Sequence, residues 1–165
     1  MALLKSLTRK KRIMHFLDQI HKDATVLDIG CGDRWAGEHL RSSGVENYTG
    51  LDLANPAADI VGDILKWKKL GLKENSFDYI LLFEVIEHVD CMEDCFKLLK
   101  PGGKLMLTSP VPHFDWVMKI LERVGLNQKR TSPHSNLIYF DKVKTFTDKD
   151  IDVILFVSQF GIFTK

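Results

Sequence analysis

Acidic residues close several short apolar runs in the first half of the chain. The run VLDIGCGD (26–33) places acids on both sides of two glycines, and three later runs end in Asp52, Asp63 and Glu84. Carboxylates accept hydrogen bonds from hydroxyl and amino groups and attract positive charge. Glycines let the backbone turn tightly beside a ligand. This combination predicts a binding site for a ligand that carries hydroxyl groups and a positively charged group.

The glycine spacing argues against a dinucleotide ligand. A dinucleotide site uses G-x-G-x-x-G, with the pyrophosphate at the N-terminus of the following helix. Here Gly30 and Gly32 are followed by Trp35 at the third position, and Asp28 and Asp33 flank the turn. Carboxylates repel a pyrophosphate, so a nicotinamide-dependent oxidoreductase is disfavoured.

These acids need a sheet that brings strand ends together at one edge. Apolar runs predict strands at 26–30, 48–53, 59–64, 77–83 and 104–110, and helical patterns predict helices at 4–21, 35–43 and 92–99. The runs are continuous, as in strands that are buried on both faces. Strands that alternate with helices favour a parallel sheet, in which ligands bind beyond the carboxyl ends of the strands. We therefore predict an α/β fold with a doubly wound, mostly parallel sheet and flanking helices.

Five motifs occur in a recognisable order along this predicted core. They are DIGCG (28–32), LDL (51–53), GDI (62–64), FDYILLFEVIEHV (77–89) and LLKPGGKLMLTSP (98–110). Together they resemble the class I S-adenosylmethionine-dependent methyltransferases, and most closely the small-molecule methyltransferase type 11 group that is similar to quinone-biosynthesis enzymes. The resemblance covers about residues 20 to 110. It implies a Rossmann-like fold and S-adenosylmethionine as the cofactor.

The resemblance also implies roles in the loop after the first strand. The backbone of Gly30, Cys31 and Gly32 would line the amino-acid end and the ribose of the cofactor. Asp28 would hold that loop or reach the ammonium group of the methionine part.

Further roles are implied at the next two strand ends. Asp52 would accept hydrogen bonds from the ribose hydroxyls, and Leu53 would lie against the adenine. Asp63 and Ile64 would contact the adenine edge. The plainer alternative for either acid is a turn or solvated residue.

At the end of the fourth predicted strand, Phe83 and Glu84 would close the floor of the cofactor pocket. The EVIEH signature of the family is matched by residues 84–88. His88 in this signature would orient a substrate or act as a base, or it would cap or pack, and we favour the structural role.

The methyl acceptor is expected beyond the fifth predicted strand. His113 and His134 are the candidate catalytic residues, because histidine has the pKa range to deprotonate a hydroxyl or amine acceptor. Trp116 and Tyr139 are candidate substrate contacts. For each histidine, a surface loop residue remains the alternative.

Two other clusters could form sites. His88, Cys91 and Cys95 recur at helical spacing, but a structural zinc site normally has four ligands, so we predict no metal. The basic run 9–12 is expected to be a solvated face, with a role on an anionic membrane or polyanionic substrate as the alternative.

Composition and charge bear on whether the protein binds nucleic acid, spans a membrane or is secreted. The net charge of +1 gives no reason to expect nucleic-acid binding. No apolar run approaches the roughly 20 residues of a membrane helix, although peripheral membrane contact stays open. Three cysteines suggest no disulfide framework, and no secretory leader is evident, so we expect a cytoplasmic protein.

The 165 residues predict a single methyltransferase domain. It divides into an N-terminal helix (1–22), a cofactor-binding core (23–110), an acceptor-side cover segment (111–146) that begins with a helix at 114–124, and a last helix with a truncated strand (147–165). The last helix is inferred from the capping-box pattern of Thr147 and Asp150. The C-terminal strand hairpin of the family is therefore expected to be shortened, by truncation or natively, and such an unfinished sheet edge allows a homodimer.

The resulting functional prediction is methyl transfer from S-adenosylmethionine to a small-molecule acceptor, lipid- or sugar-containing, by in-line displacement. The Asn/Asp-Pro-Pro-Tyr signature of amino methylation is absent, since the fifth predicted strand leads into TSPVPHF (108–114). The alternative is a non-catalytic methyltransferase-like subunit that acts through a protein partner.

Overall fold

The structure is a computed structural model that describes residues 2–112, 138–154 and 157–165. The predicted helix at 114–124, most of the predicted cover segment, and the candidate residues His113, Trp116 and His134 lie outside the described residues. In the described part of the chain, no helix is long and apolar enough to span a membrane.

A seven-stranded sheet in the order β3-β2-β1-β4-β5-β7-β6 organises the molecule. Its strands are β1 (Val26–Ile29), β2 (Tyr48–Asp52), β3 (Ile60–Val61), β4 (Phe77–Phe83), β5 (Leu99–Pro110), β6 (Asp148–Ile154) and β7 (Ser158–Thr164). The first five strands pair in parallel, whereas β7 runs antiparallel to both β5 and β6. The five predicted strands and the α/β fold with a mostly parallel sheet are therefore confirmed.

The strand order creates a switch point between β1 and β4. From β1 the chain moves outward through β2 to β3, and it then returns to place β4 on the other side of β1. The carboxyl ends of β1 and β4 diverge toward opposite connections at this point, which is where parallel α/β sheets bind their ligands. The predicted site residues thus lie at the edge where a ligand is expected.

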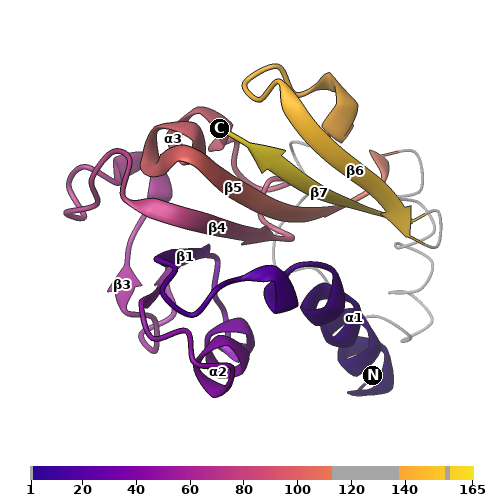
Figure 1. Cartoon of the computed structure of the whole chain (residues 1–165), viewed down its shortest axis with the longest axis horizontal. Helices are drawn as coiled ribbons and strands as arrows, with labels where there is room; N and C mark the ends of the chain where they lie inside the picture. The colour runs from indigo at the N-terminus through magenta and orange to yellow at the C-terminus, as the bar shows by residue number, and fades with distance from the viewer. Residues whose placement is uncertain (1, 113–137, 155–156) are drawn as a thin grey trace.

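Helices cover both faces of the sheet (Figure 1). Helices α1 (Ala2–His15) and α2 (Trp35–Ser42) lie on one side and α3 (Met92–Leu98) on the other. Short 3-10 turns occur at η1 (Leu17–Gln19), η2 (Ile64–Lys66) and η4 (Phe140–Lys142). The helix predicted at 4–21 is shorter than expected, because the chain tightens into η1 after His15.

The core has two layers because successive strand residues point to opposite faces. In β4, Tyr79 and Leu81 pack with α1, η1 and α2, whereas Ile80 and Leu82 pack with α3. Because both faces of the central strands are buried, these strands appear in the sequence as continuous apolar runs.

The prediction of a last helix and a shortened hairpin is wrong. Residues 148–154 and 158–164 form a complete antiparallel hairpin, with Asp150 opposite Ile162 and Asp148 opposite Thr164. Alternate residues of β6 are exposed, among them Asp148, Asp150 and Asp152. This period of two and the β-branched Ile151 and Val153 favour a strand over the local capping pattern.

The sheet edge is therefore finished, and three exposed aspartates of β6 protect it from pairing with another chain. An unfinished edge was the reason to expect a homodimer, so that expectation loses its support.

Candidate cofactor site

The loop after β1 needs glycine at two positions. Gly30 has φ 73° and Gly32 has φ 50°, a left-handed backbone that other residues rarely adopt. A Cβ atom at Gly30 would also lie 2.5 Å from Cγ2 of Val85, in the loop after β4. The glycines therefore allow the loop after β1 and the loop after β4 to approach closely.

Asp52, at the carboxyl end of β2, fastens this loop. Its carboxylate accepts hydrogen bonds from the backbone N–H groups of Gly32 (3.2 Å), Ala54 (3.1 Å) and Asn55 (3.0 Å). Partial burial opposes ionisation, but the three N–H donors outweigh it and lower the pKa of Asp52. Asp52 is thus an ionised acceptor beside the glycine loop, as a partner for ribose hydroxyls would need to be.

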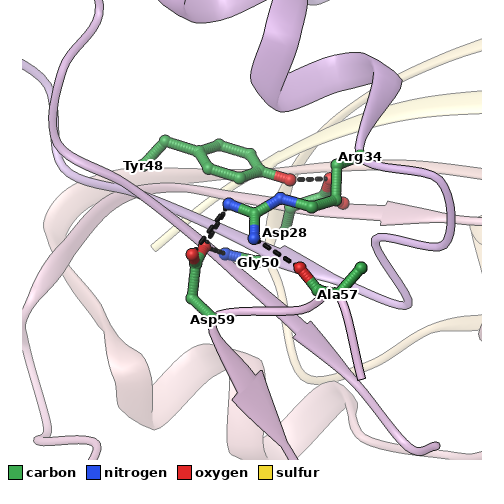
Figure 2. Close-up of polar contacts among 6 residues, drawn as sticks. All are labelled: Asp28, Arg34, Tyr48, Gly50, Ala57 and Asp59. Carbon is green, nitrogen blue, oxygen red and sulfur yellow. Dashed lines mark hydrogen bonds and ion pairs between the residues drawn. The ribbon is translucent and has the colours of Figure 1, made fainter. Parts of the chain in front are cut away.

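Asp28 lies behind the loop, away from solvent (Figure 2). Its carboxyl group is 3% exposed and accepts a 2.6 Å hydrogen bond from the hydroxyl of Tyr48. Burial raises the pKa of Asp28 from 3.8 to about 6, although the Tyr48 hydrogen bond opposes the rise. Of the two roles expected for Asp28, this contact fits the one that holds the loop.

An arginine clamp that the sequence analysis missed fixes the far side of the loop (Figure 2). Arg34 donates from Nη2 to both carboxylate oxygens of Asp59 at 2.7 Å and from Nη1 to the carbonyl of Ala57 at 2.6 Å. Asp59 also accepts from the backbone N–H of Gly50 at 2.7 Å. These bonds connect the start of α2 with the segment between β2 and β3, so they help to fix the position of the glycine loop that precedes α2.

The predicted adenine contacts have unequal exposure. Leu53 is 70% exposed just beyond β2 and offers a free apolar surface. Asp63 caps η2 by accepting from the N–H of Leu65 at 3.0 Å, whereas the side chain of Ile64 lies in the core. Contact of these residues with adenine stays a prediction.

The end of β4 carries a strained acidic residue. Glu84 has φ 57°, one of three left-handed non-glycine residues in the described part of the chain. Its Oε1 accepts hydrogen bonds from Oγ1 of Thr108 (2.9 Å) and from Nη2 of Arg12 (2.6 Å). Strained backbone of this kind clusters at functional sites. The ring of neighbouring Phe83 stacks on Trp35 at 6.0 Å between centroids.

Helix α1 contributes two arginines that sequence reasoning assigned to a solvated face. Arg9 pairs with Asp33 of the glycine loop and lies 5.3 Å from the ring centre of Trp35. Arg12 pairs with Glu84 and is only 12% exposed, and its Nε is buried without a hydrogen bond. A solvated face is therefore wrong for Arg9 and Arg12. Their spacing of three residues, which places them on one side of a helix, was the available signal.

Glu87, which the sequence analysis named only as part of the EVIEH signature, is a buried acid close to Glu84. It is 1% exposed, and Oγ of Ser109 lies 3.3 Å from its Oε2. Burial, and then the charge of Glu84, raise the pKa of Glu87 above its usual value. His88, the next residue, is exposed, and its N–H donates to the carbonyl of Val85 at 2.8 Å.

The other candidate residues do not gather into a second site in the described part. Tyr139 precedes η4 and is 39% exposed. Cys91 and Cys95 are buried, in contrast to the exposed His88. Among the described residues, no group of three or more His, Cys, Asp or Glu side chains is arranged to hold a metal ion.

The geometry therefore combines an ionised acid, a glycine loop and a switch point between parallel strands. A family model described as a methyltransferase domain matches residues 6–155, which is most of the chain. The chain belongs to the methyltransferase domain family. The predicted resemblance to methyltransferases is thereby confirmed.

Two relatives and one solved structure illustrate the range of similarity. The ubiquinone biosynthesis O-methyltransferase of Dechloromonas aromatica is 29% identical over 51% of this chain and 43% of its own length, and that of Idiomarina loihiensis is 26% identical over 74% and 59%. A SAM-dependent methyltransferase from Archaeoglobus fulgidus shares the fold with a TM-score of 0.69 and 15% identity, over 96% of this chain and 93% of its own. The chain thus spans about half the length of the curated relatives it matches.

The site residues of the methyltransferase domain fit S-adenosylmethionine, the cofactor of the family. Asp52 is ionised beside the loop, and among the described residues a Cβ on Gly32 would meet one backbone atom, at 3.9 Å, so that part of the structure leaves room at Gly32. The carboxylates of Asp33 and Glu84 lie near this loop and suit a cationic ligand. Hydroxyl groups and positive charge, the two features predicted from the acids, are both present in this cofactor.

Proposed function

We propose that the chain transfers a methyl group from S-adenosylmethionine to a hydroxyl group of a small-molecule acceptor. The observation that carries the proposal is the Asp52 cluster, in which one ionised carboxylate at the end of β2 organises the glycine loop of a methyltransferase domain. The relatives named O-methyltransferases support oxygen as the atom that receives the methyl group.

The chain's own residues would perform binding and orientation. The cofactor supplies a methyl group already activated on a positively charged sulfur. Displacement in line requires the acceptor oxygen to be aligned with that methyl group, and such alignment alone can supply roughly 7–11 kcal/mol. The ends of β4 and β5, with Glu84, Thr108 and Ser109, would form the boundary between cofactor and acceptor.

The acceptor is expected beyond the end of β5. His113 and His134 remain the candidate bases, and Trp116 and Tyr139 the candidate acceptor contacts, with an apolar lipid- or sugar-containing molecule as the acceptor. His88 is a further substrate candidate, supported by its exposure beside the acid pair at the end of β4. A cytoplasmic location and contact with a membrane surface stay predictions.

Calorimetric titration of the purified chain tests the cofactor half. We expect micromolar binding of S-adenosylmethionine and S-adenosylhomocysteine, no binding of NAD, and loss of binding in Asp52→Ala. Asp148→Ala is the matched control, because Asp148 is an exposed acid on β6, at the opposite edge of the sheet from β2 and β3. Equal binding by Asp52→Ala and wild type would contradict the proposed site.

The same titration separates the alternative function. A folded chain that binds neither cofactor form would favour a non-catalytic subunit that acts through a protein partner. If binding is seen, acceptor screening with His113→Ala and Trp116→Ala follows. Unchanged turnover in both variants would remove these residues from the acceptor site.

A further inference from the structure

Two carboxyl groups meet at the end of β4 in unequal surroundings. The Glu84 side chain is 38% exposed and accepts hydrogen bonds from Arg12 and Thr108. The Glu87 residue is 1% exposed; its carboxyl group shares a hydrogen bond with that of Glu84 and has a longer contact of 3.3 Å with Oγ of Ser109. The guanidinium group of Arg12 therefore stabilises negative charge on Glu84, whereas Glu87 has no direct positive partner among its described contacts.

Among residues 2–112, 138–154 and 157–165, one positive charge is bonded to this pair. Helix α1 contributes Arg12, which is bonded to Glu84, and β5 contributes the uncharged hydroxyls of Thr108 and Ser109. His88 follows Glu87 in the chain and is exposed. Two neighbouring carboxyls with one cation cannot both ionise easily. Burial, and then the charge of Glu84, raise the pKa of Glu87 from 4.5 to about 8.

The pair lies between the two halves of the proposed site. Val85 lies between Glu84 and Glu87 in the chain. It packs so closely on the glycine loop that a Cβ at Gly30 would lie 2.5 Å from its Cγ2. On the other side, Thr108 and Ser109 belong to the end of β5, where the acceptor is expected. A positive charge bound at the glycine loop would therefore lie near the pair.

We propose that the Glu84–Glu87 pair releases a proton when the positively charged methyl donor binds and regains one when the donor becomes its neutral product. This inference rests on the proposed function. A nearby cation favours the ionised form of a carboxyl group. The positive charge of the sulfonium group would therefore compensate the negative charge that a bound proton neutralises in the free protein.

Charge and atoms balance across the transfer. The bond between the methyl carbon and sulfur breaks, and sulfur keeps the electron pair and becomes a neutral thioether. The acceptor oxygen bonds the methyl carbon and gives up its proton. The pair then holds two negative charges, with Arg12 as its counter-charge in the described part of the chain, and it takes up one proton, equal in number to the proton that the acceptor released.

The pair would thereby help the protein to distinguish donor from product. Below the pKa of Glu87 in the free protein, donor binding must expel a proton, whereas product binding need not. Above that pKa the pair is already doubly charged and attracts the donor directly. The affinity for S-adenosylmethionine relative to S-adenosylhomocysteine should therefore rise with pH, by at most about tenfold per pH unit, and level off above pH 8 to 9.

Calorimetry in two buffers with different ionisation enthalpies measures the released protons without an acceptor. At pH 7 we expect wild type to release up to about one more proton with S-adenosylmethionine than with S-adenosylhomocysteine. Glu87→Gln keeps the shape and the uncharged state of the buried group, so it should abolish its contribution. Subtraction of the variant also removes protons that come from the cofactor's own amino group.

Three outcomes separate the inference from the proposed function. Binding of both cofactor forms with the same proton numbers in wild type and Glu87→Gln overturns the inference and leaves the function intact. Absence of any cofactor binding by wild type overturns the function itself. A wild-type excess that disappears at pH 9.5 and in Glu87→Gln supports the inference.

A second variant keeps the test decisive if Glu87→Gln does not fold. The Ser109 hydrogen bond lowers the pKa of Glu87, so Ser109→Ala should shift the pH range of excess proton release upward. An unchanged range in Ser109→Ala would overturn the inference.

Discussion

The two strand ends that form the switch point are held in different ways. The loop after β1 is fixed by residues within about 30 positions of it, through Asp28–Tyr48, Arg34–Asp59 and the three N–H groups on Asp52. The end of β4 is held by Thr108 of β5 and by Arg12 of α1, which is 72 positions away from Glu84. Helix α1 also reaches the cofactor loop through Arg9 on Asp33, but that loop has several further bonds from its own neighbourhood, whereas the boundary with the acceptor depends more on the docking of the terminal helix.

The largest expected effect is in the loop after β1. Gly30→Ala combines a left-handed backbone, which costs about 1–2 kcal/mol, with a clash against Val85 that costs about 1–3 kcal/mol more. We expect a loss of stability of that size in urea denaturation and a fall of more than about tenfold in affinity for S-adenosylmethionine.

Gly71→Ala is the matched control for the strain alone. Gly71 has φ 81°, but a Cβ there would meet none of the described atoms within 4 Å. The Gly71→Ala variant should lose only the stability that corresponds to the backbone cost, about 1–2 kcal/mol, and should keep full cofactor affinity. Equal effects of the two substitutions would show that the contact between the two loops is unimportant.

The buried carboxyl behind the loop gives the next effect. The folded-state pKa of Asp28 lies near 6, above the unfolded value of 3.8, because burial disfavours its charge. The folded state therefore favours the protonated form, and this stabilisation is full below pH 3.8 and is lost as pH rises through 6. The difference amounts to roughly 3 kcal/mol at neutral pH.

Asp28→Asn should remove this pH dependence and keep an acceptor for Tyr48. We expect the variant to gain stability relative to wild type as the pH of urea denaturation is raised from 4 to 7. A difference between the two proteins that is constant over this range would mean that Asp28 is ionised at no extra cost in the folded state.

The contrast between the two strand ends also explains what the sequence could predict. Asp28, Gly30, Gly32 and Asp52 stand at fixed short distances along the chain, and a parallel sheet needs only its strand ends to bring them together. The fold of the core and the candidate cofactor loop were therefore readable as motifs. The prediction for the site residues still awaits a binding measurement.

Long-range partners carried no such signal. Arg12 and Glu84 meet only because α1 packs across the end of the sheet, and Arg34 meets Asp59 only after β2 has paired with β1. The C-terminal hairpin was missed for a related reason. Residues 148–154 pair with β7, which in turn pairs with β5, and this long-range pairing adds to the local alternation of β6, whereas the sequence prediction followed the capping pattern alone.

A smaller effect is expected on the side that depends on α1. Arg12→Met removes the charged hydrogen bond to Glu84 and should weaken docking of α1 by about 1–2 kcal/mol. Amide hydrogen exchange should rise within residues 2–15 and stay unchanged in β1 and β2. Lys10→Met is the control, because Lys10 is exposed on the same helix. Faster exchange throughout the sheet would show that α1 is part of the global folding unit.

The smallest expected effect is at the ion pair between Arg34 and Asp59, beside the loop after β1. The Arg34 and Asp59 side chains are 20% and 36% exposed, so their ion pair should contribute only about 0.5–1 kcal/mol. A double-mutant cycle with Arg34→Ala and Asp59→Ala, followed by urea denaturation, measures this coupling. Asp59 also accepts from Gly50, so Asp59→Ala alone should cost more than Arg34→Ala. If the coupling is near zero while both single variants lose cofactor affinity, backbone contacts to Ala57 and Gly50 hold the loop, and the charges are incidental to its preorganisation.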